Sequence, residues 1–63
     1  MNFGSKLKKL RGDKTQEEIS KEIGITLSSW AMYEQNKRIP RDEVKIKIAQ
    51  FFNTTVQEIF FEP

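Results

Sequence analysis

The sequence contains no cysteine and no histidine among its 63 residues. Without cysteine there is no disulfide and no thiolate zinc site. Without histidine, the commonest general base and the commonest metal ligand are both missing. We therefore expect a protein that is not an enzyme and that needs no metal, no other cofactor and no small-molecule ligand.

Long apolar stretches are also missing. No segment approaches the ~20 apolar residues of a membrane-spanning helix, and only two prolines and three glycines interrupt the chain. A chain of this length forms one domain, and so small a domain buries only about 60% of its unfolded surface. We expect a single cytoplasmic domain without a membrane partner, stabilised by helix packing and helped by a partner subunit.

Charge is distributed unevenly, although the net charge is only +2. Residues 1–14 carry +4 and residues 37–47 carry +3, whereas the segment between them carries −3 and the remainder −2. Such blocks are compatible with an ordinary solvated surface. They are equally compatible with two basic segments that converge on a polyanion in the folded protein.

Apolar residues recur at helical spacing, without the alternation that is typical of strands. Thr15 with Glu18 and Thr55 with Glu58 show the capping-box pattern that opens a helix. Gly24 is suited to end one. The sequence therefore predicts an all-α fold with five short helices, at about 3–11, 15–23, 26–35, 41–52 and 55–61.

The join between the second and third predicted helices is the most informative feature. Only Ile25 separates Gly24 from Thr26, and threonine is a favoured first cap of a helix. Two helices joined this tightly cross steeply. Ser20, four residues before Gly24, provides the small side chain that such a crossing needs.

On a helical wheel, the third predicted helix has two contrasting faces. Trp30 and Tyr33 lie on one of them and are expected in the core. The opposite face is small, weakly polar and free of charge, which suits insertion between two rows of phosphates and contact with base edges. This outer face consists of Leu27, Ser28, Ala31, Met32 and Gln35.

Several sequence segments resemble the helix-turn-helix of the lambda-repressor and Cro-like family of bacterial and phage transcriptional regulators. The likeness spans nearly the whole chain. It implies a compact five-helix DNA-binding domain over residues 1–63, acting as a sequence-specific repressor on a palindromic operator in double-stranded DNA. The matching segments are Thr15-Gln16-Glu17-Glu18-Ile19-Ser20, Gly24-Ile25-Thr26, Tyr33-Glu34, and Ala49 followed by residues 53–59.

The resemblance also implies roles for individual residues. Gln16, at the start of the second helix, would hold a backbone phosphate, the alternative being a plain surface residue. Their apolar character, and not the resemblance, gives Leu27 and Met32 two interpretations: contacts with thymine methyl groups or ordinary exposed apolar residues. The implied base-reading residues are Thr26, Leu27, Ser28 and Met32, to which the outer helix face adds Ala31. The implied backbone clamp consists of Asn36, Lys37 and Arg38.

One ion pair and one contact between subunits follow from the same resemblance. Arg11 in the first helix is expected to pair with Glu34 at the end of the third, in a structural role. The aromatic residues Phe51, Phe60 and Phe61 allow two interpretations. They either close the core beneath the first helix or form a homodimer contact that sets two recognition helices one DNA turn apart.

Several features depart from the family pattern. The connection between the first two helices is short, Ser20 replaces a usual Ala, and Leu27 and Met32 replace residues that are often polar. Trp30 stands where the family usually has Ile or Val, and Asn36 stands where Gly is common. A second function also stays open. The chain could be a protein-interaction module, such as an antitoxin or an accessory partner of another regulator, with the uncharged helix face and the C-terminal aromatics binding protein.

Overall fold

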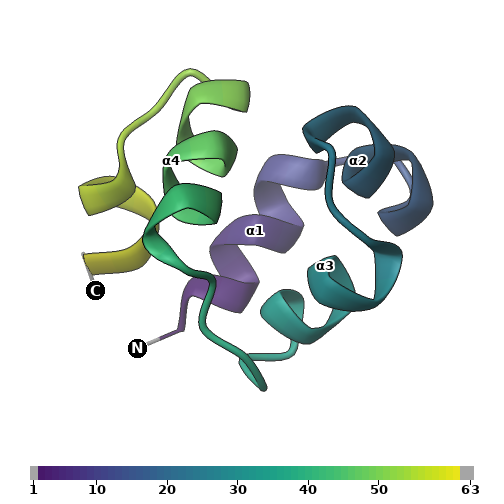
Figure 1. Cartoon of the computed structure of the whole chain (residues 1–63), viewed down its shortest axis with the longest axis horizontal. Coiled ribbons are helices and arrows are strands. Elements are labelled where there is room, and N and C mark those ends of the chain that lie inside the picture. Colours follow the sequence, from purple (N-terminus) through teal and green to yellow (C-terminus); the bar gives the residue numbers. More distant parts are fainter. Residues whose placement is uncertain (1, 62–63) are drawn as a thin grey trace.

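The computed structural model describes residues 2–61, and within them five helices follow one another through short loops (Figure 1). No strand occurs in this range, so the predicted all-α class is confirmed. None of these helices is long and apolar enough to cross a membrane. The helices are α1 (Phe3–Arg11), α2 (Gln16–Ile23), α3 (Leu27–Glu34), α4 (Asp42–Phe51) and η1 (Gln57–Phe61).

The starts of α2 and α3 are set by threonine side chains. Thr15 Oγ1 accepts the Glu18 N–H, and the Glu18 carboxylate accepts the Thr15 N–H at 2.8 Å, so the expected capping box is present. The hydrogen bonds from the Thr15 backbone and hydroxyl lower the pKa of Glu18. Thr26 Oγ1 accepts the Ser29 N–H in the same way at the start of α3. Because these contacts span three residues, the local sequence specifies them.

The last helix is wound more widely than expected. η1 is a single π-helical turn, not an α-helix. The Glu58 N–H donates to Thr55 Oγ1 at 3.1 Å, while the Glu58 carboxylate accepts from the hydroxyls of Thr54 and Thr55. The second capping pattern thus forms only in part, and the wide turn buries two consecutive residues, Ile59 and Phe60.

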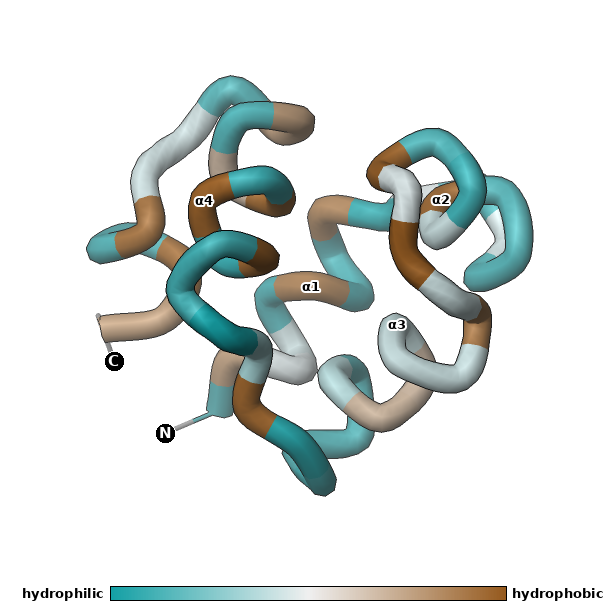
Figure 2. The backbone as a smooth tube through the Cα atoms, in the orientation of Figure 1, coloured by the Kyte–Doolittle hydropathy of each residue, from teal (hydrophilic) through white to brown (hydrophobic). Residues whose placement is uncertain are grey.

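The core lies where α1 to α4 meet η1. Trp30 and Tyr33 are both buried, in agreement with their predicted face of α3. Figure 2 shows hydrophobic and hydrophilic stretches along α4. Its buried residues are Ile48 and Ala49, whereas Ile46 is 49% exposed. The largest fully enclosed side chains are Trp30, Leu7, Ile19 and Ile48.

The first turn of α1 crosses the end of α3 at a glycine. A Cβ atom on Gly4 would lie only 2.2 Å from the carbonyl oxygen of Glu34. The Gly4 N–H donates to Asn36 Oδ1 at 3.0 Å, and Asn36 Nδ2 donates to Asn2 Oδ1 at 3.0 Å. The Asn36 side chain, in the loop after α3, therefore caps the beginning of α1.

The three C-terminal aromatic residues have different environments. Phe60 is only 2% exposed and packs on Phe3 with ring centroids 5.4 Å apart. It closes the core beneath α1, which favours the first of the two interpretations for Phe60. Phe51 is 40% exposed and Phe61 50% exposed, which leaves both available to a partner.

Phe51 is also displaced from the buried face of α4. Its ring stands edge-on against Phe52, with centroids 5.1 Å apart, and Phe52 packs on Trp30 at 6.4 Å. Because α4 ends at Phe51, the chain turns at Phe52. The Phe52 ring therefore covers the core, and the Phe51 ring remains outside it.

Candidate nucleic-acid interface

A tight turn joins α2 to α3. Gly24 has the left-handed φ of 92°, and the N–H groups of Gly24 and Ile25 both donate to the Ser20 carbonyl at 2.9 Å. Ser20 is only 3% exposed, as expected for a small residue at the crossing. Ile25 packs against the core, and its burial holds α3 across α2.

This crossing leaves one side of α3 open to solvent. Leu27 is 46% exposed and Met32 is 36% exposed, while Ser28 is exposed and Ala31 half-buried. None of these side chains carries a charge. The face predicted to meet base edges is therefore accessible, and its apolar members lie outside the core.

Thr26 is tied up in the cap at the start of this helix. Its hydroxyl accepts the Ser29 N–H at 3.0 Å and donates to Ser29 Oγ at 2.9 Å. The hydroxyl thus lacks a free hydrogen for a base edge as long as the cap is intact. Thr26 fits the role of orienting α3 better than that of reading a base.

The loop after α3 places three predicted backbone contacts. Asn36 has a left-handed φ of 59°, and both polar groups of its side chain bind the beginning of α1. Asn36 Nδ2 has a second N–H besides the one bound to Asn2, so the expected contact of Asn36 with the DNA backbone stays a prediction. Lys37 and Arg38 are exposed, and neither side chain has a hydrogen-bond or ion-pair partner within residues 2–61.

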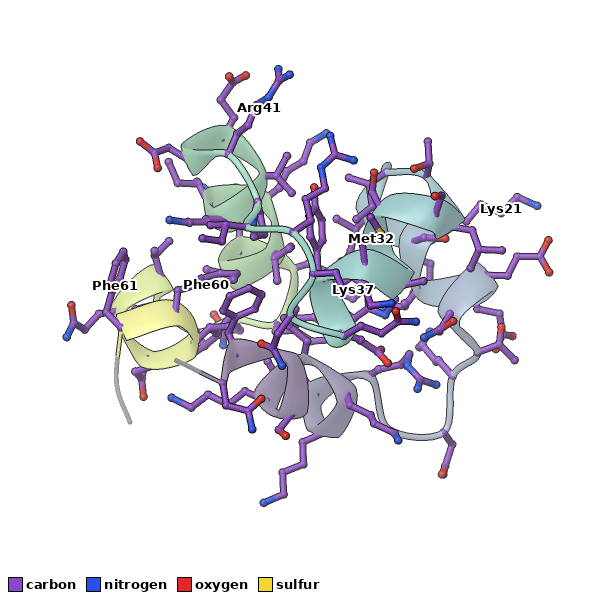
Figure 3. The ribbon with its side chains drawn as sticks, turned by 90° about the horizontal axis from the view of Figure 1, so that it is seen from below. Lys21, Met32, Lys37, Arg41, Phe60 and Phe61 are labelled. Carbon is purple, nitrogen blue, oxygen red and sulfur yellow. The ribbon has the colours of Figure 1, made fainter. Side chains whose placement is uncertain are left out.

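Figure 3 shows how these groups are placed relative to the aromatic end of the molecule. Met32 of α3 and Lys37 of the following loop lie near each other, whereas Phe60 and Phe61 lie on the other side of the view, on η1. The candidate DNA-reading face and the exposed C-terminal aromatic ring are therefore separate surfaces.

Arg41 extends the basic edge of the interface, although the sequence interpretation did not single it out. It is the N-cap residue of α4, it is exposed, and it forms no side-chain cap. With Arg38 and Thr26 it lines an open hollow of about 340 Å³ beside the start of α3. Its place directly after Pro40, at a helix start beside the basic loop, is the signal that could have identified it.

Behind the exposed face, the carboxylate of Glu34 is the centre of a hydrogen-bond network. Arg11 Nε donates to Oε2 at 2.6 Å and Arg11 Nη2 donates to Oε1 at 3.2 Å. Gln16 Nε2 donates to Oε1 at 3.1 Å, and Trp30 Nε1 donates to Oε2. The structure thus contains the ion pair that the resemblance implied, with two further donors that it did not.

This network keeps Glu34 ionised despite its burial. The Glu34 side chain is only 5% exposed, and that of Arg11 is 16% exposed. Burial alone would raise the pKa of Glu34, but the hydrogen bonds from Arg11, Gln16 and Trp30 and the charge of Arg11 outweigh it. The pKa of Glu34 therefore lies below its ordinary value of 4.5, and the same pairing raises the pKa of Arg11.

Gln16 lies where α2 begins and is half-buried. One N–H of its amide is bound to Glu34. The other N–H and the amide oxygen have no partner among residues 2–61. Gln16 is therefore held in place by Glu34 and still has one donor and one acceptor to offer. This differs from a plain surface residue, which would have no fixed partner, and from a ligand that binds only the phosphate.

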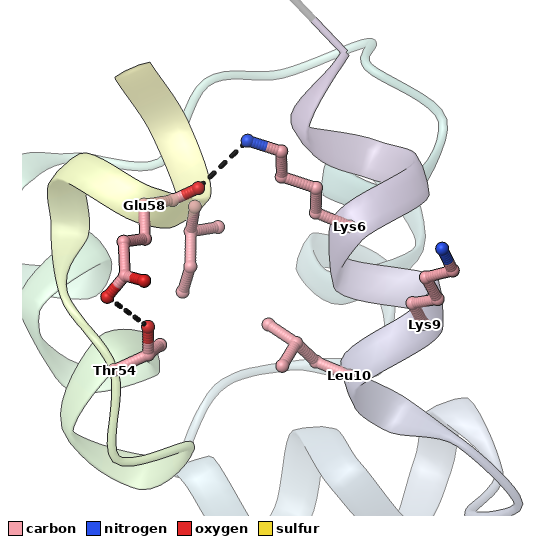
Figure 4. A pocket seen from close by; sticks show the side chains of 6 residues that line it. Lys6, Lys9, Leu10, Thr54 and Glu58 are labelled. Atoms are coloured by element: carbon pink, nitrogen blue, oxygen red, sulfur yellow. Dashed lines mark hydrogen bonds between the residues drawn. The ribbon is translucent and has the colours of Figure 1, made fainter. Parts of the chain in front are cut away.

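A second hollow, between α1 and η1, has a different character. It measures about 220 Å³, and Leu10 and Ile59 give it an apolar lining. Lys6 Nζ donates to the Glu58 carbonyl at 2.8 Å across it, and the Glu58 carboxylate accepts from Thr54 (Figure 4). These polar groups bind one another, so they do not converge on a ligand. No group of residues in the described range could hold a metal ion.

Comparison with known proteins identifies the family. A family profile described as a helix-turn-helix domain matches residues 4–60, a range that contains α2, the turn at Gly24 and α3. Neither the curated proteins nor the solved structures gave a match. The chain belongs to the helix-turn-helix domain family, a DNA-binding family, in agreement with the resemblance to lambda-repressor and Cro-like proteins.

Proposed function

We propose that this protein is a sequence-specific transcriptional regulator, a repressor that occupies an operator by inserting α3 into the major groove. One observation carries the proposal: the exposed face of α3 is uncharged, and the adjoining loop bears basic side chains that have no hydrogen-bond or ion-pair partner among residues 2–61. A groove offers base edges in the middle and phosphates along both rims. On this protein the uncharged face of α3 would meet the base edges, and the basic loop beside it would meet the phosphates.

Base contacts would come mainly from apolar groups. Leu27, Ala31 and Met32 present hydrocarbon or thioether surface that suits thymine methyl groups, and Ser28 supplies a hydroxyl for a base edge. The repressor role follows from the proposed mode of action, since a protein bound at an operator blocks other proteins from the same DNA.

Backbone contacts would come from both ends of this surface. Lys37, Arg38 and Arg41 form the basic edge after α3, and phosphate contacts of this kind supply most of the sequence-independent affinity. Gln16 lies in the first turn of α2, whose dipole favours an anion, although the carboxylates of Glu17 and Glu18 lie in the same turn.

A homodimer on a palindromic site completes the proposal. Phe61 and Ile39, which are 50% and 70% exposed, line one hollow of about 290 Å³. Exposed apolar surface of this kind is suited to a contact between two copies of the chain. Two-fold pairing would place the two α3 helices about 34–36 Å apart along the DNA.

A binding titration tests the proposed function. Fluorescence anisotropy with a random-sequence duplex, at several salt concentrations between about 50 and 200 mM, should show affinity falling steeply with salt. Selection of bound sequences from a random pool should then return a palindromic consensus. Salt-insensitive binding, or none at all, would refute DNA regulation and favour the protein-interaction module, for which exposed Leu27 and Met32 would be the docking residues.

A further inference from the structure

The carboxylate of Glu34 joins two parts of the molecule that serve different purposes. On one side it holds Arg11, whose side chain is 16% exposed, and Trp30, which is fully buried. On the other side it holds Gln16, the first residue of α2. The same buried group therefore connects the core to a side chain at the edge of the candidate interface.

We propose that Glu34 is a positioning residue for DNA binding, whose carboxylate holds the Gln16 amide with its second N–H directed at a backbone phosphate. This inference rests on the proposed function and adds to it a residue that does not touch DNA. The phosphate group of the backbone is the ligand, and Gln16 is the group that contacts it.

The chemistry of the amide explains why Glu34 decides its orientation. A glutamine amide has an NH₂ end with two donors and an oxygen end that only accepts. Glu34 is ionised and only accepts, so the NH₂ end of Gln16 must face it. A phosphate also only accepts hydrogen bonds, and the second N–H of Gln16 Nε2 is available to donate to it.

A bare carboxylate so close would repel a phosphate, and here that repulsion is suppressed. The guanidinium of Arg11 binds both oxygens of Glu34, at 2.6 and 3.2 Å, which compensates its charge. Glu34 is also only 5% exposed, so the phosphate meets the amide and not the carboxylate.

Anchoring has a further consequence for affinity. A glutamine side chain has several rotatable bonds and loses conformational freedom when it binds a ligand. Because Gln16 already has a fixed partner in the free protein, less of this freedom remains to be lost. Removing Glu34 should therefore weaken phosphate binding by Gln16 even though Gln16 itself is intact.

A double-mutant cycle on DNA affinity tests this role. Glu34→Gln replaces one of the two acceptor oxygens by NH₂, so four N–H donors must share a single oxygen and Gln16 loses its anchor. We expect Gln16→Ala to weaken binding about fivefold in the natural protein, the worth of one hydrogen bond. In the Glu34→Gln background the same change should cost less than about twofold.

Lys37→Ala is the matched control, because Lys37 has no contact with Glu34. Its effect should be the same in both backgrounds. If Gln16→Ala also costs the same in both, Glu34 does not position Gln16, while DNA binding by the protein stands. If the natural protein shows no salt-sensitive DNA binding, the proposed function and this inference fall together.

A measurement on the natural protein covers the case in which Glu34→Gln does not fold. Nuclear magnetic resonance relaxation of the Gln16 side-chain NH₂ group reports its motion before DNA is added. We expect it to be as rigid as the backbone of α2 and more rigid than the exposed amides of Gln50 and Gln57. A Gln16 amide as mobile as these two would overturn the proposal.

Discussion

Arg11 and Glu34 form a two-point ion pair that fastens the end of α1 to the end of α3, with N–O distances of 2.6 and 3.2 Å. Arg11 Nη1 also donates to the Lys14 carbonyl at 2.7 Å, which secures the loop before α2. Arg11 and Glu34 thus fix α1, α3 and the loop that leads into α2 relative to one another. They also set the position of α3 relative to the start of α2.

Loss of Arg11 should strongly destabilise the fold. In Arg11→Met the buried Glu34 carboxylate keeps its charge but loses its counter-ion, which costs about 3–5 kcal/mol in the free energy of unfolding. Urea denaturation at neutral pH measures the loss. Lys14→Met is the control, because its ion pair with Glu22 is 49% and 41% exposed and contributes about 1 kcal/mol or less. Equal losses in the two variants would contradict the structural role of Arg11.

Acidification should reduce stability through Glu34. Its pKa in the folded protein lies below the ordinary value of 4.5, so the unfolded chain takes up the proton first as the pH falls. The stability from this group is therefore complete above the ordinary pKa and is lost as the pH drops through the folded-state pKa. Urea denaturation at a series of pH values should show a steeper acid loss for the natural protein than for Glu34→Gln. Parallel curves would contradict the assignment.

Gly4→Ala should destabilise the protein despite the better helix propensity of alanine. The new Cβ would lie 2.2 Å from the Glu34 carbonyl oxygen, so α1 and α3 must move apart. Such overpacking costs about 1–3 kcal/mol, which lowers Tm by about 4–8 °C per kcal/mol in a domain of this size. Thermal unfolding followed by circular dichroism checks this, with Ser5→Ala at the exposed neighbouring position as control. An unchanged or higher Tm for Gly4→Ala would show that the two helices do not touch there.

Lys37→Ala should weaken binding to all DNA sequences alike. Loss of one phosphate contact reduces the slope of log affinity against log salt concentration by about one. Met32→Ala should instead change the sequence preference and leave the slope unaltered. Lys21→Ala controls for net charge, since Lys21 lies on α2 apart from Lys37 in Figure 3. An unchanged slope for Lys37→Ala would remove Lys37 from the interface.

Phe61→Ser should separate dimerisation from folding. Phe61 is 50% exposed, so its replacement should leave Tm nearly unchanged while it weakens self-association and binding to a palindromic duplex. Sedimentation equilibrium and titration of a full site against a half-site measure both effects. If the full-site affinity is retained, the contact between subunits lies elsewhere.

The sequence by itself determined the first four helices and the two sides of α3, but not the π-helical form of η1. The capping box at Thr15, the turn at Gly24 and the cap at Thr26 depend on contacts between residues a few positions apart, so local sequence is sufficient for them. Helical periodicity likewise separated buried Trp30 and Tyr33 from the exposed outer face.

Only the tertiary structure decided how side chains distant in sequence share their partners. Asn36 caps the beginning of α1, and Gln16 joins Arg11 on Glu34, although 18 to 34 residues separate these partners. The burial of Phe60 and the exposure of Phe51 depend on where α4 ends and how η1 is wound. Periodicity shows which way a residue faces on its own helix, but which atoms meet it there depends on how the helices cross and how closely they approach.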